Sequence, residues 1–161
     1  MVPPARPSRK KETPPRPPAA ALAPRPAGYS GTPLAKKLGV RDNQRTWRSQ
    51  MPPSVAEEIA ASGPQPTLLQ RPEPGLEMAH VFVARRVELA HLLDKLRPLL
   101  APAGILWVSW PKKSSGVATD ITEDTIRAEA LPLGLVDIKV CAVDMTWSGL
   151  KLVIRKSERK S

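Results

Sequence analysis

Two adjacent lysines, two serines and a glycine follow a mostly apolar segment in the stretch WPKKSSGVATD. Lys112 and Lys113 carry positive charge, and Ser114 and Ser115 carry hydroxyl groups. Gly116 lets backbone N–H groups approach a ligand closely, because glycine has no side chain. A predicted helix follows, and its N-terminus adds a partial positive charge. This combination of groups suits the binding of a phosphate or a carboxylate.

Two interpretations of this loop stay open. Adjacent lysines on a surface loop are often only solvated, although loops of this kind frequently carry function. The loop is not a Walker A loop, since the spacing G-x-x-x-x-G-K-[ST] is absent. Asp120 could contact the same ligand, or it could cap the helix that follows.

Residues from other segments could complete the site. Tyr29 and Ser30 belong to a glycine-rich entry segment and could close over a ligand. Asp144 and Trp147 lie in a predicted hairpin loop and could line the same edge. Hairpin loops also favour Asp, Ser and Gly for turn chemistry alone, so a structural role is at least as plausible for these two residues.

Several kinds of chemistry have no support in the sequence. There is no G-x-S-x-G elbow and no convincing Ser–His–Asp order, so no catalytic residue is assigned. A single cysteine excludes an intramolecular disulfide framework and a multi-cysteine zinc site. The two histidines are eleven residues apart with no cysteine near them, so no metal ligand is assigned either.

Alternating strand and helix patterns must position the loop. Apolar runs of strand length predict strands over 78–84 and 105–110, and leucines at helical spacing predict a helix over 87–100. Thr122 is the expected N-cap of the next helix. The C-terminal part alternates as a hairpin, with strands near 136–143 and 150–154.

The N-terminal half gives weaker signals. Thr32 as N-cap, Pro33 at the first helical position and Gly39 as a stop predict a short helix over 33–38. Further elements are predicted at 44–50 (a weak, polar strand), 53–61 (a helix) and 67–70 (a short strand). Together the elements predict an α/β fold of the Rossmann type, an open and mainly parallel sheet with helices on both faces and a C-terminal antiparallel hairpin.

The composition predicts one folded domain with basic ends. Of the 161 residues, 20 are proline, and nine of these lie in residues 1–27. That segment is expected to be a disordered, proline-rich tail with a charge of +5. The domain is expected over 28–156, followed by a basic tail over 157–161. Much of the net charge of +10 therefore lies near the chain ends, where it can attract nucleic acid weakly and without specificity.

No membrane association is predicted. The longest apolar run near the N-terminus is too short for a secretory signal, and no stretch approaches the ~20 apolar residues of a membrane span. A reducing cytoplasm is the expected compartment.

The segments 28–39 (GYSGTPLAKKLG) and 110–156 resemble an uncharacterised bacterial family, domain-of-unknown-function family 3052. The order of elements in the second half is also similar to that of class I S-adenosylmethionine-dependent methyltransferases. That resemblance implies a cofactor held by a glycine-rich turn after the first strand and by an acidic residue at the end of the second. The corresponding stretches here, TWRSQMPPSV and TLLQRPEPG, have prolines in the turn and Gln70 at the strand end.

The leading hypothesis is therefore a non-catalytic Rossmann-like domain that requires no cofactor. It would recognise an anionic small molecule or a protein partner through the loop 111–118. An atypical S-adenosylmethionine-dependent methyltransferase is one alternative, and association with nucleic acid through the basic tails is another.

Overall fold

The computed structural model describes residues 31–159. The predicted tail over 1–27, together with Tyr29 and Ser30, lies outside the described residues. No helix within the described range combines the length and apolar character needed to cross a membrane.

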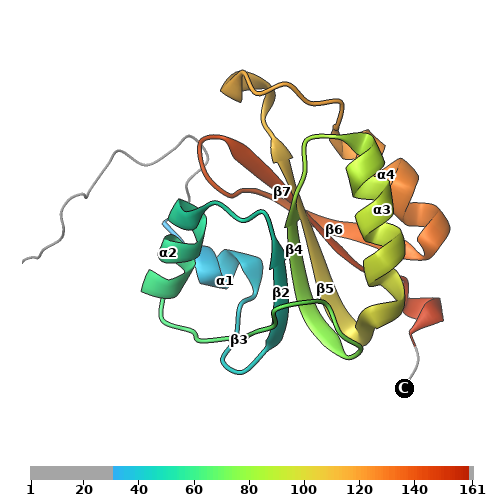
Figure 1. Ribbon diagram of the computed structural model, residues 1–161, viewed down its shortest axis with the longest axis horizontal. Helices are drawn as coiled ribbons and strands as arrows, with labels where there is room; N and C mark the ends of the chain where they lie inside the picture. The colour runs from blue at the N-terminus through green and yellow to red at the C-terminus, as the bar shows by residue number, and fades with distance from the viewer. Residues whose placement is uncertain (1–30, 160–161) are drawn as a thin grey trace, which may run out of the picture.

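One sheet of six strands organises the described part of the chain, in the order β3-β2-β4-β5-β7-β6 (Figure 1). The strands β2, β3, β4 and β5 run parallel to one another, whereas β7 runs antiparallel between β5 and β6. The strands are β2 (Arg45–Ser49), β3 (Thr67–Leu68), β4 (Leu76–Phe82), β5 (Leu100–Pro111), β6 (Leu135–Ala142) and β7 (Trp147–Ile154). The predicted fold class is confirmed.

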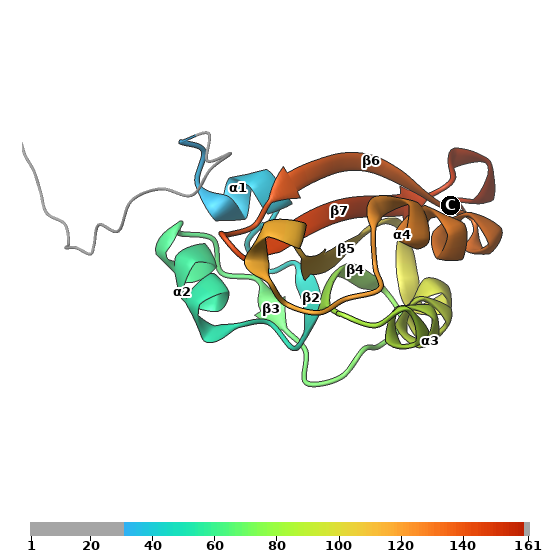
Figure 2. The same ribbon diagram turned by 90° about the horizontal axis from the view of Figure 1, so that it is seen from above.

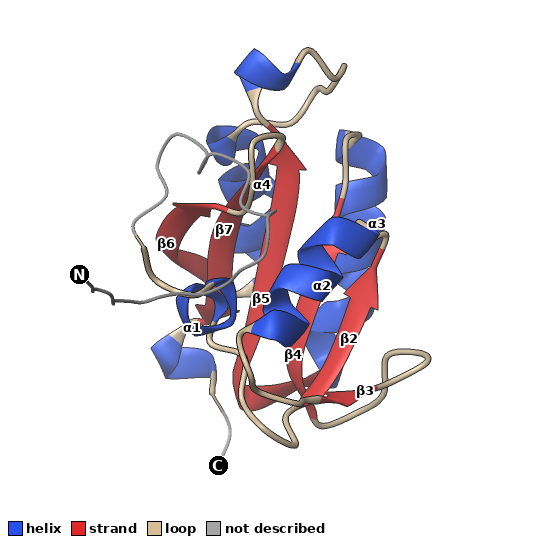
Figure 3. Ribbon diagram, turned by 90° about the vertical axis from the view of Figure 1, so that its left-hand side faces the viewer, coloured by secondary structure: helices blue, strands red, loops and turns tan. Residues whose placement is uncertain are grey.

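Within residues 31–159, four α-helices cover the two faces of this sheet. They are α1 (Leu34–Leu38), α2 (Pro53–Ala61), α3 (Arg86–Leu96) and α4 (Glu123–Ala130). The helices α1 and α2 lie on one face, and α3 and α4 lie on the other (Figures 2 and 3). Short 3-10 turns at Arg97–Leu99, Lys113–Ser115, Leu131–Leu133 and Lys156–Glu158 complete the described structure.

Each face of the sheet has its own buried core. On the α3 and α4 side, the leucines predicted at helical spacing pack on alternate residues of β4, β5 and β7. On the α1 and α2 side, a second core contains Leu38, Ile59, Met78, Phe82 and Trp107. The central strands are buried on both faces, which explains their nearly continuous apolar sequence.

The boundary between α3 and β5 differs from the prediction. The helix ends at Leu96 rather than at residue 100, because Pro98 lacks a backbone N–H and a 3-10 turn follows. The strand then begins at Leu100, which pairs with Leu76. Gly104 fits there because a side chain would lie 2.9 Å from the carbonyl oxygen of Leu76.

The start of α1 also differs from the prediction. The N-cap is Pro33, with φ −55° and ψ 142°, and no side chain caps the helix. The predicted cap at Thr32 is therefore wrong. The predicted stop is confirmed, since Gly39 adopts a left-handed conformation with φ 80°.

Candidate functional site

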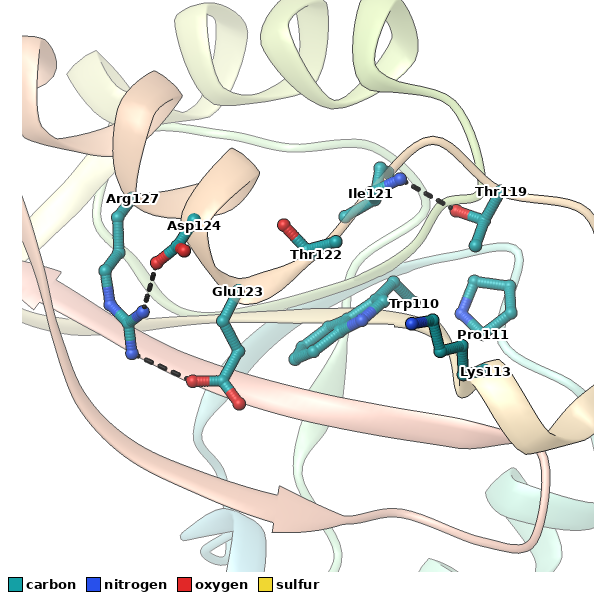
Figure 4. A pocket seen from close by; sticks show the side chains of 9 residues that line it. All are labelled: Trp110, Pro111, Lys113, Thr119, Ile121, Thr122, Glu123, Asp124 and Arg127. Atoms are coloured by element: carbon teal, nitrogen blue, oxygen red, sulfur yellow. Dashed lines mark hydrogen bonds and ion pairs between the residues drawn. The ribbon is translucent and has the colours of Figure 1, made fainter.

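A pocket of about 580 Å³ opens where β5 ends and α4 begins, a size typical of small-molecule sites (Figure 4). The end of the strand contributes Trp110 and Pro111, and the following loop and helix contribute the rest of the lining. These residues are Lys113, Thr119, Ile121, Thr122, Glu123, Asp124 and Arg127. The pocket thus lies beside the loop predicted from the sequence.

Arg127 links α4 to the hairpin through three carboxylates. Its Nε donates to Asp137 of β6 at 3.0 Å, and its two terminal nitrogens lie 2.9 Å from Glu123 and 3.0 Å from Asp124. Hydrogen bonds to Asp137 and Glu123 raise the pKa of Arg127 above its ordinary value. The guanidinium is therefore fixed in place and already paired.

The charges that line this pocket do not favour an anion. The lining includes two cationic side chains, Lys113 and Arg127, and two carboxylates, Glu123 and Asp124, and Arg127 is already paired with both carboxylates. Lys112 is half-buried and is not among the lining residues. The two lysines of the loop therefore do not act together on this pocket.

Hydrogen bonds within the loop explain its shape. Ser115 donates from its hydroxyl to the carbonyl of Lys112, and the hydroxyl oxygen accepts from the N–H of Val117. Gly116 adopts a left-handed conformation with φ 78°. Ser114 is exposed. Ligand binding by these residues stays a prediction.

The end of the loop is tied to the end of β4. Thr119 donates from its hydroxyl to the carbonyl of Ala84, and the carboxylate of Asp120 accepts from the N–H of Arg86 at the start of α3. Asp120 thus holds the preceding helix α3, whereas the following helix α4 is capped by Thr122, as predicted. The pocket and the end of β4 are therefore held next to each other.

Asp144 and Trp147 shape the hairpin between β6 and β7. The carboxylate of Asp144 accepts from the N–H groups of Thr146 and Trp147 at 2.8 Å each. The ring of Trp147 packs edge-on against Phe82, with ring centroids 5.1 Å apart. Neither residue lines the pocket beside β5.

The sheet also has a topological switch point between β2 and β4. From β2 the chain runs through α2 to β3 on one side, whereas β4 and α3 lead to β5 on the other. Ligands of open α/β sheets bind outside the carboxyl ends of the strands at such a point. Gln50, the first residue after β2, has φ 59°, a left-handed conformation that favours glycine.

A buried histidine lies on β4 near this switch point. His80 is 1% exposed, and its Nε2 lies 2.7 Å from the hydroxyl oxygen of Ser109. Its Nδ1 has no hydrogen-bond partner among the described residues. Burial, and secondarily the charge of Arg48 on the neighbouring strand, lower the pKa of His80 to about 3. The ring is therefore neutral at physiological pH.

Sequence reasoning did not include Arg127, Glu123 and Thr119 among the candidate site residues. The spacing of Glu123 and Arg127, four residues apart on one helix, is a signal that predicts their ion pair. The contact between Arg127 and Asp137 could not be predicted, because it depends on how α4 packs against β6.

Solved structures with a similar fold include methyltransferases. A SAM-dependent methyltransferase from Aquifex aeolicus aligns with a TM-score of 0.56 and 10% identity, over 75% of this chain and 88% of that chain. The mitomycin 7-O-methyltransferase MmcR aligns with a TM-score of 0.53 and 12% identity, over 75% of this chain and 52% of its own. No family model and no curated protein matches the chain.

These comparisons correct the leading functional hypothesis. The prediction of a non-catalytic domain that binds an anionic partner through 111–118 is wrong, since methyltransferases are among the structures that share the fold. The charges of the pocket also argue against binding of an anion there, because its two cationic side chains are balanced by two carboxylates. The resemblance to domain-of-unknown-function family 3052 stays a prediction. The chain has a Rossmann-like α/β fold similar to that of these methyltransferases.

Proposed function

We propose that this protein is an S-adenosylmethionine-dependent methyltransferase with an atypical cofactor site. The observation that carries the proposal is the fold that it shares, over 75% of its length, with two methyltransferases, one of which is described as SAM-dependent. The cofactor would lie at the switch point between β2 and β4, where this class of sheet binds its ligands. When bound, the cofactor would supply a methyl group activated on a sulfonium sulfur.

The residues at the switch point fit such a cofactor in part. The left-handed Gln50 gives the turn after β2 a backbone conformation that glycine usually provides. Pro52 and Pro53 lie at the start of α2, so two backbone N–H donors are missing there. After β3 the chain presents Gln70, an exposed amide, where the resemblance implies a carboxylate for the ribose. We therefore expect weak binding of the ribose.

The pocket beside β5 is the proposed place of the methyl acceptor. The hydrogen bond from Thr119 to Ala84 holds this pocket next to the end of β4, one strand away from the cofactor site. Trp110 offers an apolar wall, while Lys113 and Glu123 offer a donor and an acceptor to orient a polar substrate. Both signs of charge are present, so a substrate with mixed polar groups fits better than an anion.

Substitution of Gln70 by glutamate tests the cofactor site, because it should raise the affinity for S-adenosylmethionine. Wild-type protein should retain radiolabelled S-adenosylmethionine in equilibrium dialysis. Gln70→Glu should tighten binding by about tenfold, because a hydrogen bond to a charged acceptor contributes about 1.5–3 kcal/mol. Because Gln70 is exposed, the substitution should not perturb the core.

Gln65→Glu is the matched control. Gln65 is also exposed, and it precedes β3 rather than following it. It should leave the affinity unchanged. If neither the wild type nor Gln70→Glu retains the cofactor, the proposed function is wrong. If both variants tighten binding equally, the cofactor does not lie at the end of β3.

A further inference from the structure

Four lysine side chains gather where α1 meets the C-terminal hairpin. The lysine cluster consists of Lys36 and Lys37 of α1, Lys139 of β6 and Lys151 of β7. Lys37 donates from Nζ to the carbonyl of Ala142 at 3.0 Å, and Lys139 donates from Nζ to the carbonyl of Lys37 at 3.1 Å. These contacts bring α1 and the edge of the sheet together, although they are about a hundred residues apart along the chain.

Lys139 and Lys151 are directly opposite each other on neighbouring antiparallel strands. Cross-strand partners share a face of the sheet, and like charges in this position destabilise it. Burial and the charge of Lys139 lower the pKa of Lys151. Among residues 31–159 neither of these two lysines has an ion-pair partner, whereas arginines pair with several of the carboxylates. Their repulsion is therefore not offset by an acidic side chain.

A pocket of about 410 Å³ lies against this cluster. The described residues that line it include three of the lysines but no acidic residue, and they are Thr32, Lys36, Lys37, Lys139, Val140, Cys141 and Ala142. The hydroxyl of Thr32 and the thiol of Cys141 add polar groups to the ammonium donors. Burial raises the pKa of the Cys141 thiol, although Lys37 and Lys139 oppose that shift, so the thiol stays neutral at physiological pH.

We propose that the lysine cluster binds a phosphate group of a ligand. A phosphate monoester carries a charge of about −1.5 to −2 at neutral pH, enough to offset the facing pair of ammonium groups. Each ammonium has three N–H donors, and phosphate oxygens accept several hydrogen bonds at once. The site lies on the α1 face of the hairpin, opposite the face that carries α4 and its pocket, so the proposal does not depend on methyl transfer.

Titration with inorganic pyrophosphate measures this binding directly. Calorimetry at a constant ionic strength of about 0.15 M, where distant surface charges are screened, should show saturable binding to the full-length protein. The double variant Lys139→Gln/Lys151→Gln should weaken it by at least about tenfold, since it removes one ammonium group that lines the pocket and the charge directly opposite it. The matched control Lys95→Gln/Lys156→Gln changes the net charge equally at two exposed positions outside the cluster. It should retain affinity within about twofold, as expected for screened surface charges.

A second measurement separates a binding defect from a folding defect. Without ligand, the Lys139→Gln/Lys151→Gln protein should melt at a temperature equal to or higher than the wild type, because the repulsion is removed. Pyrophosphate should raise the melting temperature of the wild type and of the control only. A double variant that melts normally and binds like the wild type would overturn the proposal, as would equal losses in the variant and the control.

A short single-stranded oligonucleotide distinguishes the possible sources of the phosphate. Saturable binding of pyrophosphate alone identifies a small phosphorylated molecule. If the oligonucleotide also binds, and binds more weakly to the Lys139→Gln/Lys151→Gln protein, the lysine cluster also binds the backbone phosphates of a nucleic acid. If the wild type binds neither probe, the lysine cluster is not a phosphate site. Failure of cofactor binding in the dialysis experiment has no bearing on these outcomes.

Discussion

His80 is the residue whose ionisation the fold opposes most clearly. Its pKa is lowered to about 3 in the folded protein, against an ordinary value of 6.5. Between these values the unfolded chain binds a proton that the folded chain does not. The free energy of unfolding should therefore fall as the pH drops from about 6.5 towards 3, by about 1.4 kcal/mol per pH unit for this group.

Denaturant titrations at several pH values, compared with those of His80→Gln, isolate this contribution. The variant cannot bind a proton at this position, so its stability should depend less steeply on pH in the same range. Other groups titrate in both proteins and cancel in the comparison. Identical slopes would show that the His80 ring is accessible to protons in the folded state.

Among the candidate residues, structure also separates site roles from supporting roles. Lys113 lines the pocket beside β5. The carboxylates of Asp120 and Asp144 instead accept hydrogen bonds from backbone N–H groups, at the start of α3 and in the hairpin loop respectively. Their residue types alone are compatible with either role, because Asp serves both as a ligand and as a cap or turn residue. Only the positions of α3 and the hairpin distinguish the two.

At the scale of elements, one buried hydrogen bond attaches α1 to the sheet. The indole Nε1 of Trp107 on β5 donates to the carbonyl of Leu38 at 2.7 Å. Trp107→Phe keeps an aromatic ring but leaves this carbonyl without its donor. We expect a loss of about 1–3 kcal/mol in the free energy of unfolding, with faster hydrogen exchange of the α1 amides.

Trp110→Phe on the same strand provides the comparison. Trp110 is also buried, but it lines the pocket on the other face of the sheet. This variant should leave the protection of the α1 amides unchanged. If both variants expose α1 equally, the hydrogen bond from Trp107 is not what attaches this helix.

At the scale of the whole molecule, the two cores share their central strands. Met78 and Trp107 contribute to the core under α1 and α2, while Ala79 and Leu106 of the same strands contribute to the other. Because β4 and β5 belong to both cores, unfolding of either strand exposes apolar side chains on both faces of the sheet. Calorimetry of the full chain should therefore show one cooperative transition, with equal calorimetric and van't Hoff enthalpies. Two separated transitions would show that the two faces unfold independently.

The sequence by itself determined the fold class and most elements of the second half. The apolar runs at β4 and β5, the leucines of α3 and the alternation along β7 reflect burial patterns that repeat locally. The alternation along β6 does not, since Ile138 and Val140 are exposed. The order of these elements implies right-handed crossovers, which leave few possible sheets. The N-terminal half carries weaker local patterns, because β2 is polar and β3 has only two residues.

Only the tertiary structure decided which charged groups meet. Arg127 pairs with Asp137 across two elements, and α1 brings its lysines to β6. Lys139 faces Lys151 because of a register that includes an irregularity after Asp137. Contacts of this kind depend on packing angles and strand register, whereas periodicity reports only which face of an element is buried. Most elements could therefore be predicted from the sequence, whereas the charged contacts between elements could not.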